Sequence, residues 1–121
     1  MKIKNIIDIW RTRFLLCVSI SLLLSAKGLG QLPTATIGGT TTVCQNAAQP
    51  NITFTGADGT APYTFTYTIN SGGFLSVTTI TGNSVTVPVA TGTEGVFTYT
   101  LISVSDANFP NQASSGFAVV T

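Results

Sequence analysis

The sequence contains no histidine, and it has no lysine or arginine after Lys27. All five basic residues lie near the start of the chain: Lys2, Lys4, Arg11, Arg13 and Lys27. The remainder carries three acidic residues, Asp58, Glu94 and Asp106, and hence a net charge of −3. Without basic side chains it cannot neutralise phosphates, which excludes nucleic acid as a partner. Nucleophilic catalysis needs a base beside the nucleophile, so we also predict that the protein is not an enzyme.

The first 30 residues have the three-part pattern of a secretory signal peptide. Four basic residues precede the apolar residues 14–24, and small residues follow at Ala26, Gly28 and Gly30. The apolar run is shorter than the ~20 residues that a helix needs to cross a bilayer. We therefore predict a helical signal peptide in residues 1–30, with cleavage after Gly30 or, alternatively, after Ala26 or Gly28. An uncleaved membrane anchor is the other interpretation of this pattern.

The signal peptide predicts export through the inner membrane to the periplasm, the cell surface or the medium, without membrane insertion after cleavage. Cleavage would remove Cys17 with the peptide, and Cys44 is the one cysteine of residues 31–121. We predict a single domain in residues 31–121, in which Cys44 is an unpaired thiol.

Residues 31–121 are rich in threonine, and several stretches alternate between apolar and polar side chains. This period of two is typical of strands with one buried face, which β-branched residues favour. Pro88 lacks an N–H, so we expect its strand to lie at a sheet edge or to end there. A change of phase after Leu101 predicts a β-bulge. The predicted strands cover residues 34–37, 40–43, 52–55, 63–69, 74–80, 85–89, 97–104 and 115–120.

Short turns rich in glycine and asparagine separate these stretches. About seven short strands with such turns predict an all-β fold, an antiparallel β-sandwich of Ig-like type. In that fold the turns that hold Asp58 and Asp106 share one end, and Glu94 lies at the opposite end. The same strand order places Cys44 away from the turn of Asp106.

Several stretches resemble known surface modules. Residues 61–67 read APYTFTY and residues 95–106 read GVFTYTLISVSD, which are similar to strands of PKD-like and related Ig-like modules. Residues 36–46 read TIGGTTTVCQN and lead to ITFTG at residues 52–56. This wider pattern resembles the repeats of very large Bacteroidota cell-surface proteins, including adhesins linked to gliding and type IX secretion. The resemblance implies a surface-exposed repeat module of Ig-like or PKD-like type.

The resemblance also implies a disulfide that this chain lacks. The related repeats usually carry a second cysteine in or near the turn after the "VSDA" strand, where it is expected to pair with the early one. Residues 107–112 hold no cysteine here, so Cys44 has lost the partner that the resemblance implies.

Asp58 and Asp106 are the candidate metal ligands. Two carboxylates at one loop end, completed by carbonyls and waters, suit calcium, which takes 6–8 oxygen ligands. The alternative is that each aspartate caps backbone N–H groups of its own turn. Tyr63, Tyr67 and Tyr99 offer rings that could stack on a sugar, although they share the phase of the predicted core. No catalytic or cofactor-binding residue is predicted.

These observations leave three hypotheses. The first is a secreted or cell-surface, non-enzymatic module with a structural or adhesive role, whose partner is an unidentified extracellular protein or glycan. It could form one repeat of a larger surface protein. The second is a carbohydrate- or calcium-binding module that uses the loop end of Asp58 and Asp106. The third is a non-functional fragment of a longer adhesin gene.

Overall fold

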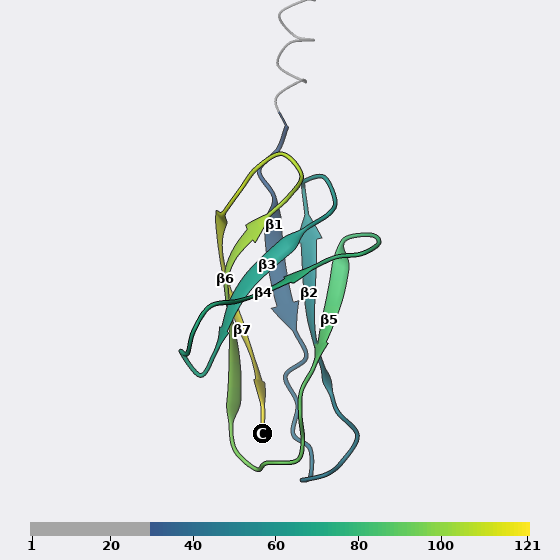
Figure 1. Ribbon diagram of the computed structural model, residues 1–121, viewed down its shortest axis with the longest axis vertical. Helices are drawn as coiled ribbons and strands as arrows, with labels where there is room; N and C mark the ends of the chain where they lie inside the picture. The colour runs from purple at the N-terminus through teal and green to yellow at the C-terminus, as the bar shows by residue number, and fades with distance from the viewer. Residues whose placement is uncertain (1–29) are drawn as a thin grey trace, which may run out of the picture. The chain divides into compact units, whose positions relative to one another are not determined.

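The computed structural model describes residues 30–121 and contains seven strands in two packed sheets (Figure 1). The strands are β1 (Thr34–Gly38), β2 (Asn51–Ala57), β3 (Thr64–Ile69), β4 (Leu75–Thr78), β5 (Ser84–Pro88), β6 (Phe97–Ser105) and β7 (Gln112–Val120). One sheet has the order β1-β2-β5 and the other the order β4-β3-β6-β7, and neighbouring strands are antiparallel. The predicted all-β sandwich of about seven strands is confirmed. The signal peptide predicted for residues 1–30 lies outside the described residues, apart from Gly30.

The core lies between the two sheets and follows from the alternation of apolar residues with threonine. Phe54 on β2 and Phe65 on β3 are fully buried, and their rings stack with centroids 5.6 Å apart. The ring of Tyr67 lies 4.9 Å from that of Phe54 and 6.1 Å from that of Tyr99. These contacts join the sheets through aromatic pairs, which add to the hydrophobic effect of burial. The other buried apolar residues are Ile52, Tyr63, Val89, Leu101, Val104, Ala118 and Val120.

All three tyrosines belong to this core, as their phase in the sequence predicts. Tyr63, Tyr67 and Tyr99 are only 4–6% exposed, so their rings are not available to stack on a sugar at the surface. The hydroxyl of Tyr63 accepts a hydrogen bond of 3.1 Å from the backbone N–H of Gly59. Burial raises the pKa of Tyr67 and of Tyr99, and charge interaction with Tyr67 raises that of Tyr99 further.

Two irregularities of the sheets occur where the sequence predicts them. Leu101 and Ser103 on β6 have partners on β3 and β7, whereas Ile102 between them has none, so the predicted bulge is confirmed. β5 is an edge strand that ends at Pro88, as expected. Val89 donates its N–H to the carbonyl of Pro50. Because such bonds alternate along a ladder, the nitrogen of Pro88 faces the open edge, where no hydrogen bond is lost.

Gly39 lets the chain leave the three-stranded sheet after β1. Its φ of +113° is a conformation that L side chains rarely adopt, and a Cβ at this position would collide with the carbonyl oxygen of Asn51. The structure therefore requires a glycine at the point where the chain crosses toward the other sheet.

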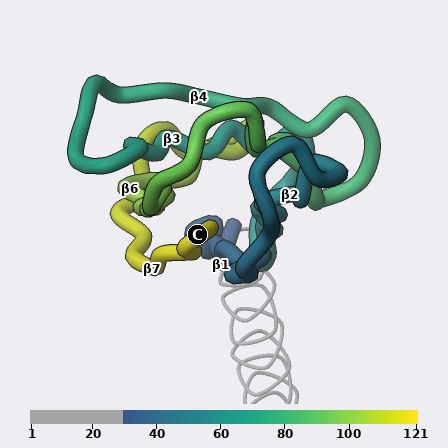
Figure 2. Tube along the Cα trace, turned by 90° about the horizontal axis from the view of Figure 1, so that it is seen from below, coloured from purple at the N-terminus to yellow at the C-terminus, as the bar shows by residue number. Residues whose placement is uncertain are grey.

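Beyond this crossing, the chain pairs with the end of β7. Thr41 donates its N–H to Val119 at 3.0 Å, Val43 donates to Thr121 at 2.8 Å, and Thr121 donates back to Thr41 at 3.1 Å. This pairing is parallel and amounts to an isolated bridge, so the strand predicted for residues 40–43 is not a full strand. Seen from below, the end of β7 lies beside β1 (Figure 2).

β1 begins at one end of the sandwich and β7 finishes at the other (Figure 1). Gln31–Thr121 forms one compact unit. Within the part of the chain that the structure describes, there is no helix that is long and apolar enough to cross a membrane.

Candidate functional site

Asp106 begins the loop between β6 and β7, and its carboxylate binds backbone N–H groups of two loops. Oδ2 accepts from Thr60 at 2.7 Å, while Oδ1 accepts from Asn108 at 2.9 Å and from Phe109 at 2.6 Å. Thr60 belongs to the loop between β2 and β3, so one side chain joins both loops. These hydrogen bonds favour the charged carboxylate. They hold the pKa of Asp106 below its ordinary value, with the bond from Thr60 as the largest cause.

Asp58 lies in the other loop of the same end and has a different partner. Its Oδ2 accepts a hydrogen bond of 2.8 Å from the hydroxyl of Thr34, at the start of β1. Asp58 is exposed and has a φ of +63°, a conformation that aspartate tolerates better than most residues. The structure thus brings the two predicted loops together, and each carboxylate has its own hydrogen-bond donors.

These contacts bear on the predicted calcium site. Both oxygens of Asp106 accept backbone N–H groups, two of which belong to its own turn, as the capping alternative predicts. A calcium ion at this end would have to share or displace those donors. Within residues 30–121, no group of three or more histidine, cysteine, aspartate or glutamate side chains is close enough to hold a metal ion. The calcium site of Asp58 and Asp106 stays a prediction.

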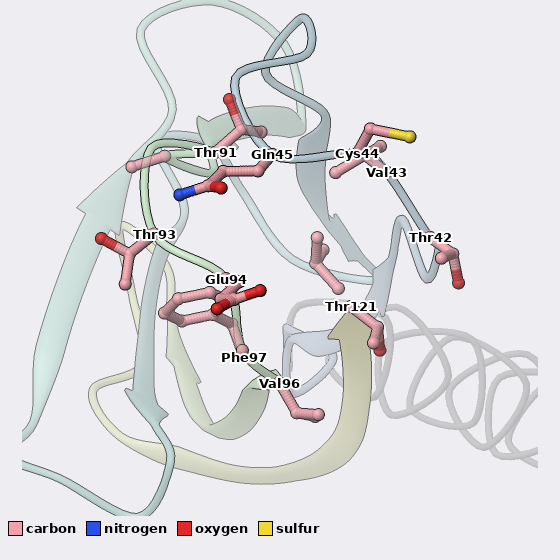
Figure 3. Close-up of a pocket in the computed structure, with 13 residues that line it drawn as sticks. Thr42, Val43, Cys44, Gln45, Thr91, Thr93, Glu94, Val96, Phe97 and Thr121 are labelled. Carbon is pink, nitrogen blue, oxygen red and sulfur yellow. The ribbon is translucent and has the colours of Figure 1, made fainter.

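A cavity of about 510 Å³ opens at the other end of the sandwich, beside the end of β7 (Figure 3). Val43, Phe97 and Val120 provide apolar walls, and Cys44 and Glu94 also line it. In Figure 3 the sulfur of Cys44 points away from Glu94 and Phe97. The cavity offers one carboxylate and apolar surface, and residues 30–121 contain no histidine, lysine or arginine.

Hydrogen bonds hold one wall of this cavity in place. Gln45 donates from Nε2 to the carbonyl of Gly92 at 3.0 Å. Asn46 donates its N–H to Thr91 at 2.9 Å, and the hydroxyl of Thr91 donates to Ala47 at 2.7 Å. These bonds fasten the turn that follows Cys44 to the loop between β5 and β6. The alternation of apolar and polar residues along a strand does not predict such a cavity, because its walls come from segments far apart in the sequence.

Cys44 and Glu94 both line the cavity at this end, away from the loop of Asp106, as the strand order predicts. Cys44 is exposed and has no disulfide partner among the described residues. A second cysteine in residues 107–112 would lie at the opposite end of the sandwich. In this fold Cys44 therefore could not form a disulfide with a cysteine at the position that the resemblance implies.

Comparison with known proteins found no match for the chain among protein-family models, curated proteins or solved structures. The resemblance to PKD-like modules accordingly rests on the motifs of residues 61–67 and 95–106 alone, and the resemblance to Bacteroidota surface repeats on residues 36–46 and 52–56.

Proposed function

We propose that the chain is a secreted or cell-surface module of Ig-like or PKD-like type that spans distance outside the cell and resists tension. The N-terminal targeting pattern, the strand motifs and the β-sandwich support this role together. The observation that carries the proposal is the parallel pairing of Thr41 and Val43 with the end of β7.

This pairing has the geometry of a mechanical clamp. The domain is entered at one end through β1 and left at the other through β7, so tension pulls the two paired segments in opposite directions along their length. The hydrogen bonds of Thr41, Val43 and Thr121 must then break together rather than one after another. The hydroxyl of Thr40 accepts a further bond of 3.1 Å from the N–H of Val119.

The outer faces of the sandwich suit a module that is surrounded by water. None of the seven strands contains a charged residue, and threonine and serine dominate the faces away from the core. Some hydroxyls pair across strands, at 2.9 Å between Thr64 and Thr78 and at 2.8 Å between Thr55 and Ser84. Such pairs stabilise a sheet and make its surface polar without charge. Any adhesive contact with an extracellular protein or glycan would be made through these faces or the loop ends.

Cell fractionation tests the proposed location. Cells that express the whole sequence should deliver a shortened chain outside the inner membrane, with its new N-terminus at Gln31 or a few residues earlier. Replacing Leu22 by Arg would interrupt the apolar run and should keep the full-length chain inside. A full-length chain found in the cytoplasm of cells that express the natural sequence would contradict the proposal.

A further inference from the structure

We propose that β4 is a dimerisation edge, through which two copies of this chain pair their β4 strands antiparallel about a two-fold axis at Val77. The two four-stranded sheets would then form one continuous sheet across the dimer. The inference rests on the backbone pattern of β4, its sequence and the position of the two most exposed apolar side chains.

The backbone of β4 has one side without a strand partner. β4 pairs only with β3, and it runs along the outside of the molecule (Figure 2). Thr79 donates its N–H to Tyr63 at 2.9 Å, which makes these two a hydrogen-bonded pair of the β3–β4 ladder. Hydrogen-bonded pairs alternate with pairs that are not hydrogen-bonded along an antiparallel ladder. The N–H and C=O groups of Val77 therefore also face β3, whereas those of Ser76 and Thr78 face outward.

The sequence of this edge lacks the features that usually prevent pairing with another chain. Residues 71–82 contain no charged residue and no proline, which are the common protective devices of edge strands. By contrast, β5, the edge strand of the other sheet on this side of the molecule, ends at Pro88. On the opposite side, the segment around Thr41 bridges the chain to the end of β7.

Two large apolar side chains flank the open edge. Ile80 is 96% exposed and Phe74 is 74% exposed, the highest values among the large apolar residues of the described domain. Each lies two positions beyond an outward-facing residue, Phe74 before Ser76 and Ile80 after Thr78. Phe74 directly precedes β4, and Ile80 follows it by two residues. If pairing with a second copy extends the strand to these two residues, the strand alternation would direct both side chains toward the outer face of the sheet.

The arrangement is complementary to itself, which identifies a second copy as the partner. Pairing Ser76 with Thr78 of the second copy also places Phe74 opposite Ile80 of that copy, because both pairs are symmetric about Val77. The dimer would gain about four ladder hydrogen bonds. Phe74 of each copy would also cover Ile80 of the other, so the interface would contain two such apolar pairs. A two-fold interface requires this kind of self-complementarity.

The register centred on Val77 is the one that pairs the two apolar side chains. A slip of one residue would place Phe74 of one copy and Ile80 of the other on opposite faces of the sheet. A slip of two residues would keep the face but would place Phe74 opposite Thr78 or Gly82.

Sedimentation velocity over a range of concentrations tests the dimer. The chain should be recovered from cells that express the whole sequence and kept under reducing conditions, so that cysteine cannot cross-link it. Ser76→Pro removes an outward N–H without breaking the β3–β4 ladder, and Ile80→Lys places a charge opposite Phe74. Each should raise the dissociation constant at least about tenfold. Circular dichroism and thermal melting establish that each variant is folded.

Two further variants make the test specific. Thr86→Pro is the matched control, because it removes an outward N–H from the β5 edge and should leave the dimer unchanged. Combining Phe74→Glu with Ile80→Lys places opposite charges face to face in the proposed register. This double variant should dimerise more tightly than Phe74→Glu or Ile80→Lys alone.

Three results would overturn the proposal. The natural chain could be monomeric at every concentration. Its dimer could be insensitive to both Ser76→Pro and Ile80→Lys, or could dissociate with Thr86→Pro. Finally, the double variant could dimerise no better than the single variants.

Discussion

The carboxylate of Asp106 accepts a hydrogen bond of 2.7 Å from the backbone N–H of Thr60, which lies 46 positions earlier in the chain. The two loops are also joined by a backbone bond of 3.0 Å from Ala107 to Thr60. Asp106 therefore fastens the ends of β2 and β6, which belong to different sheets. This role explains an aspartate at the end of the "VSD" motif without recourse to a ligand.

Asp106→Ala should lower the melting temperature by several degrees, because it leaves the N–H groups of Thr60, Asn108 and Phe109 without their acceptor. Asp58→Ala is the comparison, since Asp58 accepts only the hydroxyl of Thr34. It should have the smaller effect in the same thermal melts. Equal effects of the two substitutions would show that Asp106 has no special role in holding the loops.

Stability should fall in acid through protonation of Asp106. Its folded pKa is lowered, so its stabilising effect is complete above the unfolded value of about 3.9 and is lost as the pH falls through the folded value. Asp106→Asn removes this titration, and urea unfolding of the variant should vary less between neutral and acidic pH. An unchanged pH dependence in the variant would exclude Asp106 as a source of acid sensitivity.

Titration of the tyrosines should destabilise the domain in alkali. Burial raises the folded pKa of Tyr67 and Tyr99. Their stabilising effect is therefore present below the unfolded value of about 10 and is lost as the pH rises through the folded values. The absorbance of tyrosinate and the β-sheet circular dichroism signal should change together in a pH titration. Ionisation of Tyr67 and Tyr99 with the circular dichroism unchanged would contradict their place in the core.

Gly56→Ala should destabilise the domain by about 1–3 kcal/mol through overpacking. A Cβ at Gly56 would lie 2.5 Å from the ring of Tyr63, which is buried and cannot easily move away. Gly73→Ala is the matched control, because nothing lies within 4 Å of a Cβ at that position. Urea unfolding measures both, and a tolerated Gly56→Ala would show that the ring of Tyr63 can be displaced.

Much of this fold could be predicted because its strands have one buried face. The phase of Tyr63, Tyr67 and Tyr99 predicts the core, and the change of phase after Leu101 predicts the bulge at Ile102. Pro88 predicts the edge of a sheet, because only there does the missing N–H have no cost.

Other features depend on partners that alternation does not specify. Residues 40–43 look like an ordinary strand, yet they form only a parallel bridge after the chain crosses between the sheets at Gly39. The loop end of Asp58 and Asp106 is predicted by strand order, whereas their different donors depend on local loop geometry. The cavity lined by Cys44 and Glu94 likewise depends on how distant segments pack.

The proposed mechanical role depends on the clamp between Thr41 and β7. Thr41→Pro removes the N–H that Val119 accepts, at an exposed position outside the core. Thr86→Pro removes an outward N–H from β5 and leaves the clamp intact. Both substitutions can be compared in chains held by their two ends.

Single-molecule force spectroscopy on the natural chain and these two variants tests the proposed mechanical role. We expect the natural domain to unfold in one event at high force and Thr41→Pro to lower this force markedly. Thr86→Pro should leave the unfolding force close to that of the natural chain. A natural domain that unfolds at low force, or a Thr41→Pro variant as resistant as the natural chain, would show that the domain has no such role.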